Sequence, residues 1–166
     1  MHDADGRVEA RGSVQGEIFD VDMVGADPGA GTGSAHFAAE LLEVTEDGTA
    51  FRLRDGARSW QDRRLLLADD IRYRQEDGRL EANGHVRTTM PASELEQGSS
   101  SAGDVMVVAR SLTYDRDRRI ARYEGMVRYS DPVYTLAASV LEVRFDADNR
   151  LSEIQARCPV EVYDLV

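Results

Sequence analysis

The side chains that most often carry out catalysis are few in this chain and lie far apart. The histidines are His2, His36 and His85, and no serine, cysteine or carboxylate surrounds them in a recognisable catalytic spacing. The single cysteine, Cys158, can form no internal disulfide and supports no multi-cysteine metal site. A free cysteine is most often a small buried hydrophobic residue. We therefore expect a protein that is not an enzyme.

A glycine-rich loop is the one segment whose composition could hold a phosphate. Glycines 29, 31 and 33 lie in GADPGAGTGS (25–34). A phosphate cradle needs a buried strand before the loop and the N-terminus of a helix after it. The following segment, HFAAELLEV, has the spacing of a strand instead, so we interpret residues 25–34 as a connecting loop.

Neighbouring carboxylates do not form a site either. Asp69 and Asp70 are adjacent, so on a strand their side chains point to opposite faces and cannot act as a paired acid and base. Asp146 and Asp148 resemble the start of a calcium loop, but Arg150 and the missing mid-loop glycine argue against it. We expect no metal and no cofactor.

The charge of the chain excludes further classes of function. The net charge is −11, and all 20 cationic side chains are arginine. A strongly acidic protein repels a phosphate backbone, so nucleic-acid binding is not expected. Without lysine, neither a Schiff-base mechanism nor a P-loop is available.

The elements that would position any site are strands, and they repeat. An alanine followed by a branched aliphatic residue three positions later recurs at positions 39, 68, 109 and 138, in steps of 29, 41 and 29 residues. The polar insert at 90–103 accounts for the long step. Each such half-unit leads through a polar turn (EDGT, EDGR, DRDRR or DADNR) into a second half that often contains Gly-x-Val.

Both halves have an apolar period of two, which predicts strands with one buried face. A strand, a tight turn and a strand make a hairpin, so the chain is predicted to be an all-β, antiparallel meander of four hairpins. A leading half-unit precedes them, with edge-like strands around Val8 to Val14 and Glu17 to Val24. Trp60 follows a Gly56-Ala57 turn signal and is expected to pack in the core or at its rim.

Length and hydropathy favour one domain over residues 1–166. The apolar runs are far shorter than the roughly 20 residues that span a bilayer. The opening MHDADGRVEA does not resemble a signal peptide. Since the first unit is incomplete, we expect the chain to be one module or a trimmed part of a longer protein.

The apolar faces of the hairpins must be buried against each other, which predicts a β-sandwich or open jelly roll. Small residues among the large ones leave room for a neighbouring backbone or for a ligand. By alternation the inward face holds Ile71, Tyr73, Leu80, Ala82, Val86, Leu112, Tyr114, Tyr123, Val127, Leu141, Val143 and Phe145.

The repeated units resemble a known family. The segments ARSLTYD (109–115), ARYEGMV (121–127), EANGHV (81–86) and IQARCPVEV (154–162) look like the OstA-type repeats of the lipopolysaccharide-transport family, which includes LptA, the LptC ectodomain and the N-terminal domain of LptD. The resemblance covers 36–90 and 105–163 most clearly. Cys158, at a position where the repeat usually has glycine, and the 90–103 insert depart from it.

The resemblance implies an open β-jelly roll in the periplasm of a Gram-negative cell, with any signal or anchor removed. Its inward face, the residues given above, would bind the acyl chains of lipopolysaccharide during outer-membrane biogenesis. Partners would be lipid A and other OstA-like domains (LptC-like, LptD-like or a second copy), joined head to tail through terminal edge strands. A structural module that assembles by edge strands without lipid is the main alternative, and a jelly-roll enzyme is the third.

Overall fold

The computed structural model describes residues 7–18, 34–45, 48–92, 103–147, 151–157 and 161–164. These residues form ten β-strands, and none of the described segments is an apolar helix of membrane-spanning length. The strands are β1 (Val8–Ile18), β2 (Ala35–Val44), β3 (Ala50–Gln61), β4 (Arg64–Arg74), β5 (Arg79–Pro91), β6 (Asp104–Asp115), β7 (Ile120–Ser130), β8 (Tyr134–Phe145), β9 (Leu151–Arg157) and β10 (Glu161–Asp164).

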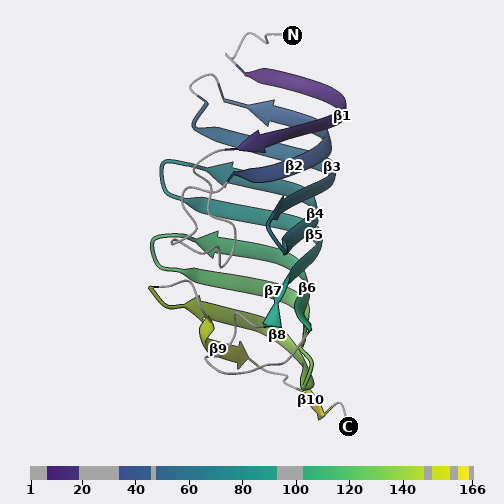
Figure 1. Cartoon of the computed structure of the whole chain (residues 1–166), viewed down its shortest axis with the longest axis vertical. Helices are drawn as coiled ribbons and strands as arrows, with labels where there is room; N and C mark the ends of the chain where they lie inside the picture. The colour runs from purple at the N-terminus through teal and green to yellow at the C-terminus, as the bar shows by residue number, and fades with distance from the viewer. Residues whose placement is uncertain are drawn as a thin grey trace.

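All strands belong to one antiparallel sheet in which β1 to β8 follow in chain order. The last two strands share β8 as their neighbour. β9 pairs with its C-terminal part, from Val140 to Phe145, and β10 pairs with its N-terminal part, from Tyr134 to Ala137. Figure 1 shows the strands stacked along the long axis, with β1 and β10 at opposite ends. The predicted all-β antiparallel architecture is confirmed.

A row of bulges crosses this sheet at mid-strand. On β5, Gly84 and His85 together lie opposite the single residue Arg110 of β6, and the same irregularity recurs at every pairing from β1 to β8. An extra residue on one strand bends that strand and increases its twist. Consecutive residues with positive φ mark the bulges on three strands: Asp55 (61°) and Gly56 (73°), Gly84 (75°) and His85 (47°), and Gly125 (81°) and Met126 (50°).

The bulges divide the sheet into two layers that bury a common core (Figure 1). Contacts such as that between the Phe37 and Phe51 rings, with centroids 6.4 Å apart, join one layer to the other. The jelly roll thus arises from a folded single sheet. The first layer comprises 14–18, 35–39, 57–68, 86–91, 104–109, 127–138 and 161–164, and the second layer comprises 8–11, 41–44, 50–54, 70–83, 111–124, 140–145 and 151–157.

Two local predictions are changed by the structure, and a third is confirmed. β1 continues without a break from Val8 to Ile18, so the expected division between Val14 and Glu17 is wrong, and residues 19–24 lie outside the described part. Gly56 and Ala57 belong to the bulge of β3 rather than to a turn, and β3 extends to Gln61. By contrast AAELLEV is strand, as expected, because it lies in β2.

Candidate functional site

The space between the two layers is the candidate site, and every residue predicted to face inward lies in it. All are between 0% and 7% exposed. They lie buried between the two layers as members of one core cluster, and their binding of lipid stays a prediction. They are Ile71, Tyr73, Leu80, Ala82, Val86, Leu112, Tyr114, Tyr123, Val127, Leu141, Val143 and Phe145.

The sequence prediction missed most of the first layer's contribution to this interior. Leu66, Met90, Val105, Val107 and Tyr129 are buried there and belong to the same core cluster. Their signal was present, because Val105 and Val107 continue the period of two toward Ala109. Strict alternation counted back from Leu112 would place Ala109 outside. The bulges on β5 and β7 shift the pairing at this point, so that Ala109 and Leu112 both face inward. Both side chains are buried.

Aromatic rings fill two regions of the interior. Phe51 of the second layer lies between Phe37 and Tyr73, and its ring centroid is 5.3 Å from that of Tyr73. Farther along the sheet, Tyr114 meets Phe145 edge-on, with centroids 6.4 Å apart. Each such ring contact stabilises the fold by roughly 0.5–1.5 kcal/mol, in addition to the free energy gained by burying apolar surface.

Polar atoms enter the interior mainly from the first layer. The buried polar side chains among the described residues are Ser59, Gln61, Arg64 and Thr88. Opposite them, burial raises the pKa of Tyr123 to about 12, and the nearby Thr88 hydroxyl partly opposes this increase. The interior is therefore apolar along most of its length, with a polar region on one wall.

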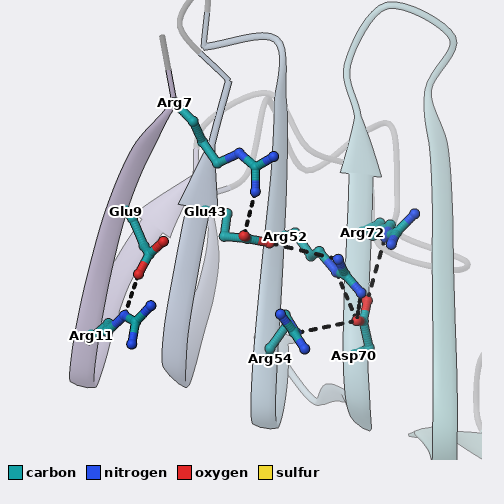
Figure 2. A network of polar contacts seen from close by, with 8 residues as sticks. All are labelled: Arg7, Glu9, Arg11, Glu43, Arg52, Arg54, Asp70 and Arg72. Carbon is teal, nitrogen blue, oxygen red and sulfur yellow. Dashed lines mark hydrogen bonds and ion pairs between the residues drawn. The ribbon is translucent and has the colours of Figure 1, made fainter. Parts of the chain in front are cut away.

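The outer face of the second layer is a network of ion pairs (Figure 2). Asp70 on β4 lies at its centre. It accepts hydrogen bonds from Arg52 on β3, including one of 2.8 Å from Nε, and this contact raises the pKa of Arg52. Arg54 and Arg72 approach the same carboxylate at 3.9 and 3.7 Å. One carboxylate is thus shared by three guanidinium groups.

The same network continues toward the edge of the sheet. Glu43 on β2 contacts Arg7 at 2.6 Å and Arg52 at 3.8 Å. A cleft of about 340 Å³ opens beside these residues, with Arg72 and Arg74 on its wall. Since every one of these arginines has an acidic partner, the outer face of the second layer is largely neutralised.

The residues considered for chemistry remain dispersed. His85 is exposed at its bulge, with its Nδ1 atom 2.8 Å from a carboxylate oxygen of Asp69. The adjacent Asp70 accepts hydrogen bonds from Arg52 instead. His36 stacks on Trp60 at the surface. No group of three metal-ligating side chains occurs in the part of the chain that the structure describes. The 25–33 loop, His2, Asp148, Arg150, Cys158 and the 93–102 part of the insert lie outside it.

No protein-family model matches the chain, and no curated protein matches its sequence. The structure is similar to that of LptH from Pseudomonas aeruginosa, with a TM-score of 0.62 over 78% of this chain and 93% of that one. The fold is of the OstA-like, LptA type. Sequence identity to LptH is only 8%.

LptH is described as the LptA-homologous periplasmic component of the conserved lipopolysaccharide-transport device. The LptA-type likeness covers the fold, since at this identity side-chain roles are not transferable. The function of the present chain must be argued from its own interior and surfaces.

Proposed function

We propose that this chain is a non-catalytic, lipid-binding bridge that holds the acyl chains of lipopolysaccharide between its two layers. The observation that carries the proposal is one apolar interior that extends from Phe37 on β2 to Phe145 on β8, while arginine and carboxylate side chains lie on the outer face of the second layer. Burying acyl chains there would supply affinity at about 25 cal/mol per Å² of apolar area without any basic residue.

The construction of the fold favours opening of the two layers. Backbone hydrogen bonds between neighbouring hairpins remain within one layer, as from Gln75 N to Thr49 O at 2.8 Å and from Phe145 N to Arg119 O at 3.0 Å. Between the layers the contacts come from side chains such as Phe37 and Phe51. An acyl chain can replace such contacts.

We further propose a periplasmic location and a single module spanning residues 1–166. Head-to-tail assembly with LptC-like or LptD-like domains, or with a second copy, would use the two ends of the sheet. Among the described strands, β1 pairs only with β2, and β9 and β10 pair only with β8, so each end of the described sheet carries a strand with one unpaired edge. Such edges accept another strand.

A second function is favoured by a different observation. The inward residues are almost completely buried, as in a core that packs against itself and holds no ligand. In that case the chain would be a structural module that assembles through its edge strands alone. Lipid binding and assembly must therefore be measured separately.

Competition binding distinguishes the two functions. We expect saturable binding of fluorescently labelled lipopolysaccharide that is competed by lipid A and not by de-acylated lipopolysaccharide, because the acyl chains are the bound part. Equal competition by the de-acylated molecule would show that the sugars or phosphates are bound. Absence of binding, together with concentration-dependent sedimentation of the protein, would establish the structural module instead.

A further inference from the structure

The outer face of the first layer differs from every other surface of the described sheet. Across β3 to β8, one row of paired residues alternates arginine with an aliphatic side chain. The order is Arg58, Leu67, Arg87, Val108, Arg128 and Ala137, each opposite the next on the neighbouring strand. We call this set the arginine–aliphatic row. The arginines are exposed and the aliphatic residues are half-buried.

The arginines of this row lack acidic partners within the described residues. Arg58 lies over the ring of Trp60 at 5.5 Å, and neither Arg87 nor Arg128 has an ion pair among the described side chains. On the second layer the opposite holds. There Arg122 contacts Glu124 at 2.7 Å and Arg144 contacts Glu142 at 3.0 Å.

The row next to it adds apolar surface and no negative charge. Trp60, Leu65 and Met106 lie on it, half-buried, and its remaining members on β5, β7 and β8 are threonine and serine. From β3 to β8 neither row contains an aspartate or glutamate, although the chain has 31 of them. At the two ends of the sheet the pairing continues to Glu17 on β1 and to Glu161 on β10. The two rows therefore form a cationic, partly apolar face on a protein whose net charge is −11.

We propose that this face docks on the surface of an anionic phospholipid membrane. Unpaired guanidinium groups bind lipid phosphates, and the aliphatic residues and Trp60 between them contact the apolar side of the headgroup region. The arginines recur on every second strand, roughly 10 Å apart. At an ionic strength of 0.1 M the screening length is about 10 Å, so the acidic residues of distant faces oppose this contact only weakly.

A bilayer suits these observations better than an acidic protein does. Acidic side chains would pair with the arginines but would leave the interleaved aliphatic residues without a partner, whereas a lipid interface offers phosphate and hydrocarbon side by side. The proposal does not depend on lipid inside the jelly roll. Docking by this face leaves the two ends of the sheet free for assembly.

Vesicle flotation tests the proposal with the full chain. We would compare vesicles of phosphatidylcholine with vesicles containing 30% phosphatidylglycerol and matched acyl chains. Binding is expected only with the anionic vesicles, and it should fall steeply with added salt. Because the acyl chains are the same in both, uptake of lipid into the interior would not produce this difference.

Two matched triple variants locate the contact. Arg58→Gln, Arg87→Gln and Arg128→Gln together should abolish flotation, with a loss of about 5-fold for each arginine removed. Arg79→Gln, Arg122→Gln and Arg144→Gln remove the same charge from the second layer and should leave flotation within about 2-fold of the unmodified protein. Melting temperatures would confirm that both fold.

Three results would overturn the proposal. They are equal flotation with neutral vesicles, equal loss in both triple variants, and no flotation of the unmodified protein. If the unmodified protein instead self-associates in a manner that Arg87→Gln abolishes, the occupant of the face is a second copy and not a membrane.

Discussion

The hydroxyl group of Thr88 faces that of Tyr123 across the interior, from opposite layers of the folded sheet. Thr88 lies on β5 after its bulge and Tyr123 lies on β7 before its bulge. The Thr88 hydroxyl lowers the pKa of Tyr123 against the larger increase caused by burial. Neither hydroxyl has a hydrogen bond of normal geometry within the described residues. This pair shows how side chains of the two layers meet in the core.

The raised pKa of Tyr123 makes stability depend on pH in the alkaline range. The folded state binds the phenolic proton more tightly than the unfolded state, so this contribution is complete below pH 10 and is lost as pH rises to about 12. The loss amounts to about 2–3 kcal/mol. Chemical denaturation at pH 9 and at pH 12 should show it for the unmodified protein and show less of it for Tyr123→Phe. An identical decrease in both proteins would contradict the assignment.

The strand register predicts opposite outcomes for two residues that are close in sequence. Leu112 is 1% exposed, so Leu112→Asp buries a carboxylate and should cost at least about 4 kcal/mol, enough to prevent folding or to lower the melting temperature by more than about 10 °C. Arg110 is exposed at the bulge row, and Arg110→Asp should change stability by less than about 1 kcal/mol. Equal tolerance in thermal melting would show that the register is wrong.

The bulges require glycine at some positions more strictly than at others. Gly84 has φ of 75°, and a Cβ atom there would overlap the carboxylate of Asp69. Gly84→Ala should therefore destabilise the protein by roughly 2–3 kcal/mol through backbone strain and displacement of Asp69.

Gly56 is the matched control for this substitution. It has a similar φ of 73°, but open space surrounds the position of its Cβ atom. Gly56→Ala should cost only about 1 kcal/mol, because strain is its single penalty. If urea denaturation gives the same free energy of unfolding for both variants, contact with Asp69 has no energetic importance.

The Asp70 carboxylate, which three arginines share, should contribute more to folding stability than an exposed ion pair does. Asp70→Asn leaves Arg52, Arg54 and Arg72 close together without their common anion, and we expect a loss of about 1–2 kcal/mol that added salt partly restores. Asp104→Asn removes only the exposed contact to Arg63 at 3.1 Å and should be nearly neutral. A salt response that does not distinguish the two variants would count against the shared-anion geometry.

Much of the fold followed from the sequence because each half-unit is short and strictly patterned. Alternation from Leu112 to Tyr114 and from Leu141 to Phe145 placed these residues on one face, and all are buried. The bulges were harder to recognise. In the sequence, a bulge shows only as the three-residue step between the inward residues Ala109 and Leu112. The step is explained by strand pairing, because β5 and β7 each have one residue more than β6 at this point.

The difference between the ion-paired outer face of the second layer and the arginine–aliphatic row of the first layer could not be predicted from local sequence. Arg52 and Arg87 are both outward residues of strands, and nothing adjacent to them in the sequence distinguishes them. Arg52 is neutralised because the register between β3 and β4 brings Asp70 beside it, whereas Arg87 lies between Leu67 and Val108. The partners of outward residues depend on strand pairing, which a period of two does not specify.

The most direct test of the proposed lipid-carrying interior is photo-crosslinking to lipopolysaccharide. A benzoylphenylalanine at Tyr114, and in separate variants at Tyr73 and Tyr129, should crosslink to the lipid, because all three side chains face the space between the layers. The same probe at Thr113, the outward neighbour of Tyr114, should not. Crosslinks at the inward positions alone are the result that we predict. No crosslink from any folded inward variant, or equal crosslinking at Thr113, would contradict a lipid-filled interior.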